Sequence, residues 1–200
     1  MEKKYILTDE RREIVDRHDR HITLYKIVAV KDFDVYALHK PRVFIGNQKH
    51  IESKIYVKHV KAGESGGWVE TESNLSQEGN AWIDRGAVVF GNATIEGDAW
   101  VGGKKTAICG EVMVCDEAKI FSDDMDDRKE KRTDISGDIK ICGRSKVTAS
   151  LQGKGIIKNI LIERPAIAVL RYPEANKPSQ TLVRFECVVG DKKLSRQYTL

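Results

Sequence analysis

The sequence predicts an all-β protein whose centre is a parallel β-helix of hexapeptide repeats. Between Gly79 and Gly102 the chain reads GNAWID, RGAVVF, GNATIE and GDAWVG. Gly or a polar residue starts each hexad, and Gly and Asn tolerate the positive φ that a tight corner often needs. An alanine recurs every six residues, and a branched residue follows two places after each one: Ala81/Ile83, Ala87/Val89, Ala93/Ile95 and Ala99/Val101.

The spacing within a hexad predicts which side chains face the interior. Side chains alternate between the two faces of a strand, so Ala81 and Ile83 point the same way and Trp82 points the opposite way. Burial of each Ile or Val stabilises the fold by roughly 1.5–3 kcal/mol. A helix is excluded because a period of six does not keep to one face of a turn of about 3.6 residues. A β-meander would need hairpin turns between longer strands.

The pattern divides the chain into three segments. Residues 1–65 read as N-terminal strands with an inserted β-hairpin at about 34–59, residues 66–165 as the β-helix with a loop at 122–134, and residues 166–200 as C-terminal capping strands. Inside the β-helix the rhythm slips by one residue near Gly102 and Gly103 and returns after the loop at Ile139. The loop spacing does not match a calcium-binding EF-hand, so we expect a solvated excursion.

Composition narrows the function classes. The 200 residues hold 34 basic and 30 acidic side chains, a net charge of +4, which is too small to favour nucleic acid as a partner. No apolar run is long enough to span a membrane. The N-terminal residues contain no apolar segment typical of a signal peptide, and the four cysteines form no CxxC pair. We therefore expect a cytoplasmic protein with reduced thiols.

One stretch carries a family resemblance. The sequence VKAGESGGWVETESNLSQEGNAWI, from Val60 to Ile83, resembles the start of the bacterial YdcK family of hexapeptide-repeat transferases. KYILTD and the segment from Tyr25 to Phe33 look like short strands of that family, and the resemblance extends to about Gly102. It implies a left-handed β-helix with triangular coils of three hexads, a trimeric hexapeptide-repeat superfamily, and phage or prophage relatives. The chain departs from the family by its shortness and by an insertion from Asp34 to His59.

Three hexads per coil would place residues 18 apart above one another. Trp82 and Trp100 then form an outward-facing stack, and Lys119 lies next on that face once the slip is counted. Two exposed tryptophans in register are unusual on a monomer. They indicate either a subunit interface or ligand-contact face, or a face that a terminal strand of the same chain covers.

Two further groups are candidates for binding or chemistry. The predicted hairpin carries His50 and His59 among lysines and could contact an acidic partner, although a solvated edge strand is favoured. The two histidines face opposite sides of the strand, so no shared metal site is expected. Cys115 and Cys142 share one corner of neighbouring coils if the loop is a simple excursion. Buried apolar thiols are favoured over a metal or redox role, and we expect no metal.

The histidine positions decide between two function classes. Hexapeptide acyltransferases resemble one another in using a histidine general base beside the coils. All five histidines here precede Val60, so the coils contain none. We therefore expect a non-catalytic binding or scaffold protein with no cofactor and an unidentified ligand, acting as a homo-oligomer or with a protein partner. The alternative is an acyl-CoA-dependent acyltransferase of the trimeric hexapeptide type, which would use acetyl-CoA and a base such as His50 or His59 if the insertion folds back.

Overall fold

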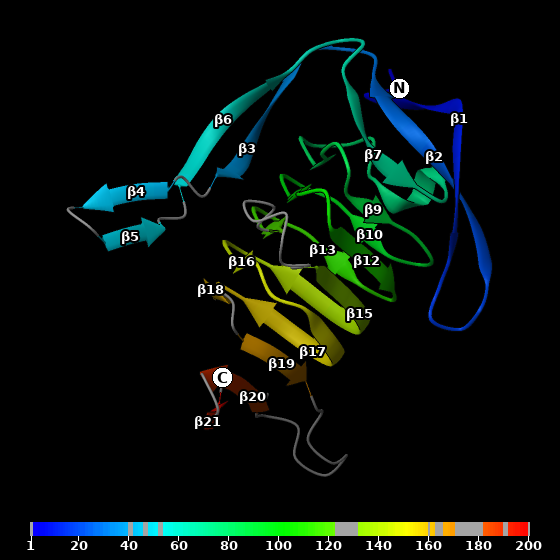
Figure 1. Ribbon diagram of the computed structural model, residues 1–200. Helices are drawn as coiled ribbons and strands as arrows, with labels where there is room; N and C mark the ends of the chain where they lie inside the picture. Colours follow the sequence, from blue (N-terminus) through cyan, green and yellow to red (C-terminus); the bar gives the residue numbers. More distant parts are fainter. Residues whose placement is uncertain are drawn as a thin grey trace.

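The computed structural model describes residues 2–39, 42–45, 48–51, 54–122, 132–159, 161–162, 166–170, 182–189 and 192–199. Apart from one 3-10 turn, η1 (Glu72–Asn74), the regular elements of these residues are β-strands. Stacked parallel coils form a β-solenoid of about 4 turns (Figure 1), which confirms the predicted fold class. Within the described residues, no helix is long and apolar enough to cross a membrane.

Each coil contributes to three faces, which we name the groove face, the third face and the arm face. The groove face contains β7 (Ser65–Val69), β9 (Val88–Val89), β12 (Thr106–Gly110) and the first halves of β15 (Thr133–Cys142) and β17 (Leu151–Lys158). The third face contains β10 (Thr94–Ile95), β13 (Met113–Val114) and the second halves of β15 and β17. The arm face contains β8 (Trp82–Ile83), β11 (Trp100–Gly102), β14 (Lys119–Phe121), β16 (Lys146–Val147) and β18 (Leu161–Ile162).

The register of neighbouring coils confirms the predicted one-residue slip. On the arm face Trp82 pairs with Trp100, which is 18 residues later, and Trp100 pairs with Lys119, which is 19 residues later. On the groove face Val88 pairs with Ala107, also 19 residues later. The additional residue therefore lies between β11 and β12, at the predicted position.

The solenoid interior is filled by the alanines and branched residues of the hexads. Ala81, Ile83, Val101 and Ile120 are all fully buried. Corners between faces use glycine in the left-handed region, as predicted. Gly79 has φ +65°, and a Cβ atom there would lie 2.4 Å from the carbonyl oxygen of Gly97 on the next coil. Glycine therefore allows the left-handed corner and the close stacking of coils together.

The N-terminal hairpin closes the first coil and then curls over the groove face. It consists of β1 (Tyr5–Val15) and β2 (His21–Ala29), and β2 pairs antiparallel with β7. The hydroxyl of Tyr5 donates to the carbonyl of Leu75 at 2.6 Å, and the buried amine of Lys4 donates to the carbonyl of Ala81 at 2.9 Å. A second apolar cluster lies outside the solenoid, where the hairpin packs on the groove face: Ile22 and Leu24 against Val88 and Phe90.

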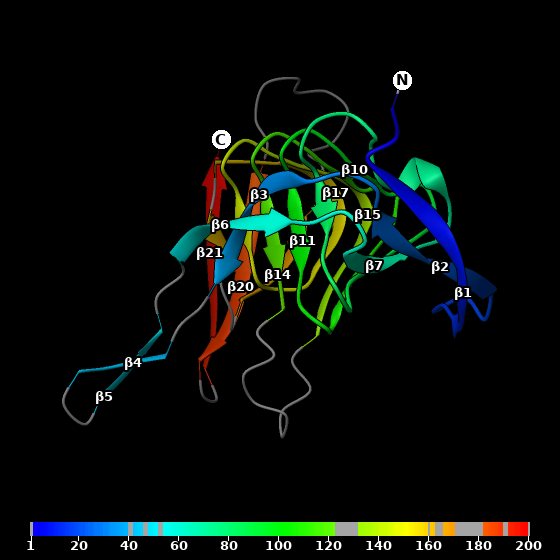
Figure 2. The ribbon, with the colours of Figure 1, turned by 90° about the horizontal axis from the view of Figure 1, so that it is seen from above.

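A long two-part arm follows β2 and crosses the arm face. β3 (Phe33–His39) pairs antiparallel with β6 (Lys54–Val60), and β4 (Arg42–Ile45) pairs with β5 (Gln48–Ile51) further out. Figure 2 shows β3 running across β11 and β14, and both strands contact it. The amine of Lys58 on β6 is 2.5 Å from a carboxylate oxygen of Asp84 and so ties the arm to the solenoid.

The other end of the solenoid continues into three strands. β19 (Ala166–Leu170) pairs parallel with β17, and β20 (Leu182–Val189) and β21 (Lys192–Thr199) follow antiparallel. Most of the predicted loop at 122–134 lies outside the described residues, and β15 resumes the solenoid at Thr133.

Candidate functional site

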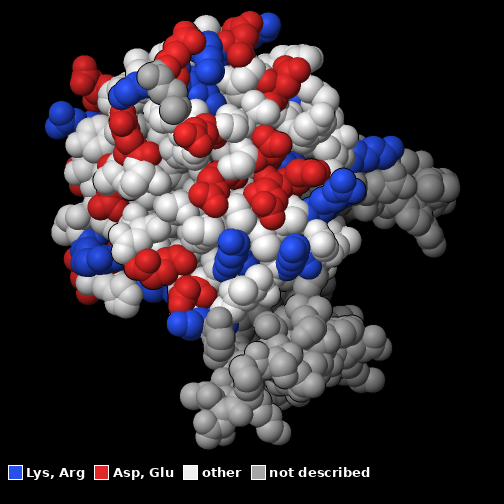
Figure 3. Space-filling model, turned by 180° about the vertical axis from the view of Figure 1, so that it is seen from behind, with Lys and Arg blue, Asp and Glu red and all other residues white. Residues whose placement is uncertain are grey.

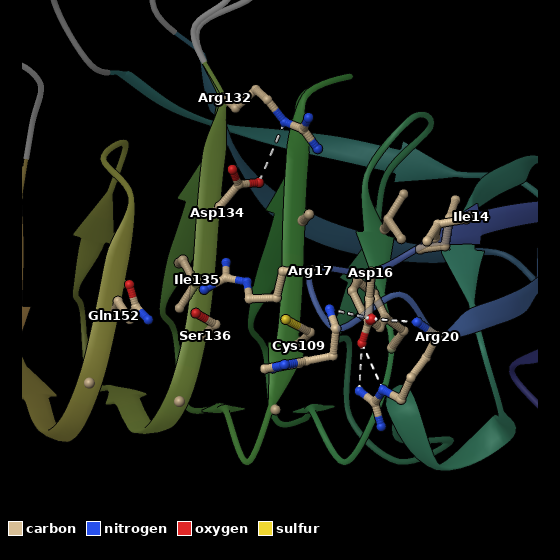
Figure 4. Close-up of a pocket in the computed structure, with 18 of the residues that line it drawn as sticks. Ile14, Asp16, Arg17, Arg20, Cys109, Arg132, Asp134, Ile135, Ser136 and Gln152 are labelled. Carbon is tan, nitrogen blue, oxygen red and sulfur yellow. Dashed lines mark hydrogen bonds and ion pairs between the residues drawn. The ribbon is translucent and has the colours of Figure 1, made fainter.

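A groove lies between the turn of the N-terminal hairpin and the groove face of the solenoid (Figure 4). Its volume of about 890 Å³ falls within the range of sites that hold small molecules and cofactors, which is roughly 300–1,000 Å³. Residues of β1 and the turn form one wall, and β9, β12, β15 and β17 form the floor. We call this cavity the hairpin groove.

The turn that forms the wall is held by Asp16. One carboxylate oxygen accepts the backbone N–H groups of His18 at 2.8 Å and Arg20 at 3.0 Å. The other oxygen accepts the Arg20 guanidinium at 2.8 Å from Nε. The backbone N–H of Arg20, its guanidinium and the N–H of His18 together lower the pKa of Asp16 to about 2. Since Asp16 fixes both ends of the turn, the intervening Arg17 and His18 are held at the groove.

The floor combines small side chains with a polar one at matching positions of neighbouring coils. Ala107 and Cys109 lie on β12, and Ser136 and Gln152 occupy the matching positions of the next coils, as the pairing of Cys109 with Ser136 and of Ser136 with Gln152 shows. Cys109 is half-buried beside the apolar cluster, and burial raises the pKa of its thiol. This thiol is therefore protonated at neutral pH and is not an activated nucleophile.

The groove is rich in arginine. Arg12, Arg17, Arg20 and Arg132 line it, together with the acids Asp16 and Asp134. Arg20 pairs with Asp16 at 2.7 Å, and Arg132 lies 3.7 Å from Asp134. Among the described residues, Arg12 and Arg17 have no ion-pair partner, and Figure 4 shows Arg17 pointing from the turn across the strands of the floor. One carboxylate oxygen of Asp134 is buried without a hydrogen bond.

The distribution of charged side chains around the groove differs from that on the back of the molecule, which Figure 3 shows. There, acidic and basic side chains are interspersed among the described residues (Figure 3). The arginines of the hairpin groove are instead gathered around one cavity. Anions, and phosphate groups above all, are the ligands that unpaired guanidinium groups bind best.

The predicted stack of Trp82, Trp100 and Lys119 is present in register but lies under the arm. Their exposed fractions are 0%, 2% and 1%. The Phe33 ring on β3 meets Trp82 edge-on at 5.3 Å between centroids, and the Phe121 ring stacks on Trp100 at 5.8 Å. Of the two alternatives for this face, coverage by the chain's own strand is the arrangement found.

Lys119 shows how the arm face accommodates a charged residue. Its amine donates to the carbonyl of Asp98 at 2.8 Å, and burial lowers the pKa of the amine to about 8. The indole N–H groups of Trp82 and Trp100 are buried without a hydrogen-bond partner. These three residues therefore have packing partners within the chain, and none of them lines the hairpin groove.

The predicted histidine candidates lie on the arm and not at the groove. His59 is exposed and contacts the Asp34 carboxylate through Nδ1. The backbone of His50 is in β5, and its side chain lies outside the described residues. The histidine that lines the groove is His18, which is not among the residues predicted for the site. The available signal was Asp16, because an acid two residues before an N–H donor is typical of a tight turn.

The fold and the groove together define a class: a parallel β-solenoid of hexapeptide coils with a ligand-sized cavity beside one face. Comparison with known proteins agrees with this class. The chain is 31% identical over 122 residues to a protein of Escherichia coli (strain K12) named "Uncharacterized acetyltransferase YdcK". The match covers 59% of this chain and 30% of the YdcK protein, so the chain spans less than a third of that relative's length. No family model matches the sequence.

This similarity bears on the two predicted functions unequally. It agrees with the resemblance to YdcK-like proteins and with the acyltransferase alternative. It gives no support to the non-catalytic binding or scaffold interpretation. The predicted trimer, the phage connection and the cytoplasmic location remain predictions.

Proposed function

We propose that this chain binds acetyl-CoA in the hairpin groove and transfers its acetyl group to an acceptor. The observation that carries the proposal is that Arg12, Arg17 and His18 line one cavity beside the groove face of the solenoid. Coenzyme A carries several phosphate groups, and guanidinium groups bind phosphate through paired, charge-assisted hydrogen bonds. The name of the similar Escherichia coli protein supports the same chemistry.

His18 is the general base of the proposal. Acyl transfer to an amine or hydroxyl needs removal of a proton from the acceptor, and histidine is the side chain that most often takes this role in enzymes. The coils lack histidine, but the hairpin brings His18 to their groove face from outside the repeat. Asp16 acts as the positioning residue, since it accepts the backbone N–H of His18 and fixes the turn.

Transfer proceeds directly from the thioester to the acceptor in this proposal. The alternative is an acetyl-cysteine intermediate on Cys109, which would need a thiolate at neutral pH. Burial raises the pKa of Cys109 and so disfavours that thiolate. His18 receives the acceptor's proton as the acceptor attacks the thioester carbonyl. The carbon–sulfur bond then breaks, and His18 returns the proton to the departing coenzyme A thiolate.

Acetyl-CoA binding, measured by isothermal titration calorimetry, is the first test. Arg17→Ala should weaken binding by roughly 10- to 150-fold, because a hydrogen bond to a charged group contributes about 1.5–3 kcal/mol. Arg144→Ala is the matched control: Arg144 is exposed, pairs with Glu117 and does not line the groove. No binding to the wild type, or equal losses in the two variants, would contradict the proposal.

The second test measures the rate at which the coenzyme A thiol is released from acetyl-CoA in the presence of a panel of amine and hydroxyl acceptors. His18→Gln should lower the rate about 100-fold or more while leaving the acetyl-CoA dissociation constant unchanged. Equal rates in wild type and variant would remove His18 from the mechanism. Binding of acetyl-CoA without turnover of any acceptor would refute the transferase activity.

A further inference from the structure

Two thiols and a carboxylate converge at one corner of the solenoid, between the third face and the arm face. Cys115 follows Val114 and Cys142 follows Ile141, and these two branched residues pair in register on neighbouring coils. The two thiols therefore stack directly above one another, as the sequence predicts. Both cysteines are free and 5% exposed. Their sulfur atoms and a carboxylate oxygen of Asp116 all lie within 4.8 Å of one another.

Asp116 stands where the neighbouring coils have glycine. Its φ is +56°, and the corresponding corners of the coils on either side are Gly97, with φ +68°, and Gly143, with φ +64°. The Asp116 Oδ2 atom accepts the backbone N–H of Gly143 at 2.8 Å. This hydrogen bond fixes the carboxylate against the coil that carries Cys142. The repeat register predicts that the two thiols share this corner, but it carries no signal for Asp116 as a third group.

We propose that Cys115, Asp116 and Cys142 form a binding site for a thiophilic divalent cation of the zinc class. Two thiolates and one carboxylate oxygen are ligands that Zn²⁺ accepts in a tetrahedral site, and water would complete the fourth position. The exposed Asp116 gives the cation a path from solvent to the two sulfur atoms. Cys109 cannot take part, because it pairs with Ser136 on the groove face.

Metal binding at the proposed site should release protons, which can be measured. Zinc-class cations bind cysteine as the thiolate, so each ligating thiol loses its proton on binding. Binding of one divalent cation by two thiols releases two protons to solvent, and the net charge of the site stays unchanged. Affinity should therefore rise with pH. A passive pair of buried thiols would show no such coupling.

Titration of the reduced, full-length protein with Co²⁺, followed by displacement with Zn²⁺, tests the proposal. We expect one equivalent of Co²⁺ to produce thiolate-to-cobalt charge-transfer absorption and the d–d bands of a tetrahedral site, with two protons released at neutral pH. Cys142→Ser should lose most of the charge-transfer absorption. Cys109→Ser, the matched control on another face, should keep it. No thiolate absorption in the folded wild type, or an unchanged spectrum in Cys142→Ser, would overturn the proposal.

Asp116→Asn keeps the proposal testable if a cysteine variant fails to fold. Asparagine tolerates the left-handed region and can still accept the Gly143 N–H, so the corner should be retained. The charge-transfer absorption should persist in this variant with a Co²⁺ affinity lowered about tenfold or more. Unchanged affinity would remove Asp116 from the site. A Cys115–Cys142 disulfide that, once reduced, gives thiols without a cobalt response would refute the metal site and assign the pair a redox role. None of these readouts depends on acetyl-CoA.

Discussion

Two faces of one solenoid, built from the same hexads, carry different outward side chains. The arm face presents Trp82, Trp100 and Lys119, and the groove face presents Ala107, Ser136 and Gln152 at floor positions. The arm lies flat across the first face and buries its large side chains. The hairpin turn covers the second face only in part and leaves a cavity. The arm face is therefore a packed interface within the chain, whereas the groove face keeps an open cavity.

The largest expected change in the free energy of unfolding comes from a substitution on the arm face. Trp82→Ala removes a fully buried ring that meets Phe33, and it should lower the free energy of unfolding by about 3–5 kcal/mol. Gln152→Ala, at an exposed position of the groove floor, should change it by less than about 0.5 kcal/mol. Urea denaturation measures both. Equal costs would show that the two faces do not differ in packing.

The contribution of the arm itself is tested by Phe33→Ala. Phe33 is partly buried against Trp82, so its loss should cost about 2 kcal/mol. Acrylamide should also quench tryptophan fluorescence more strongly, because the cover over Trp82 is reduced. Tyr36→Ala is the control on the outer side of β3, where Tyr36 is 53% exposed. If both variants are quenched alike, the arm does not shield this face in solution.

The buried amine of Lys119 should make stability depend on pH. Its pKa in the folded state is about 8, below the ordinary value of 10.5, so the unfolded chain binds more protons between these values. The free energy of unfolding should therefore rise as the pH increases from about 8 toward 10. Lys4 adds in the same direction, whereas the raised pKa values of Cys115 and Tyr5 oppose it toward the alkaline end.

Comparison with Lys119→Met isolates this amine from the other groups. The variant lacks the buried charge, so we expect it to be more stable than wild type below pH 8. This difference in the free energy of unfolding should diminish as the pH rises. Urea denaturation at pH 7 and pH 9 measures the difference. A pH-independent difference would show that the Lys119 amine is not desolvated.

A large side chain placed in the groove should change the free energy of unfolding very little. Gln152→Trp places a large side chain at an exposed floor position, so unfolding should change by less than about 0.5 kcal/mol. Acetyl-CoA binding should nevertheless fall about tenfold or more, because the ring occupies the ligand's volume. Calorimetric titration and urea denaturation separate the two quantities. Unchanged acetyl-CoA binding would place the ligand elsewhere.

The repeat made the solenoid predictable in some detail. Two coupled positions, such as Ala81 and Ile83, recur often enough to define the interior, and any shift in their spacing marks an insertion such as the slip near Gly102. Stacking of Cys115 over Cys142 followed from the same register. These features depend only on the spacing of residues along the chain, so they can be predicted from a single sequence.

The groove could not be predicted in the same way. Alternation along a strand tells which side chains share a face, but not which distant segment lies on that face. The curl of β1 and β2 over Val88 and Phe90 depends on strand twist and on packing between segments far apart in sequence. His18 and Arg17 therefore carry no signal in the sequence that links them to the groove face. Asp116 was passed over because its meaning depends on two cysteines, one of them 26 residues later.

The position of the arm in the chain sets an order of assembly. β3 leaves the ribosome before any strand of the arm face, so Phe33 and Val35 have no apolar surface to pack on until β8, β11 and β14 have been made. The first coil, in contrast, is closed by Tyr5 and Lys4 as soon as residues 75–81 emerge. The arm is therefore synthesised early but docks late, and during that interval its apolar side lacks the surface that covers it in the folded chain.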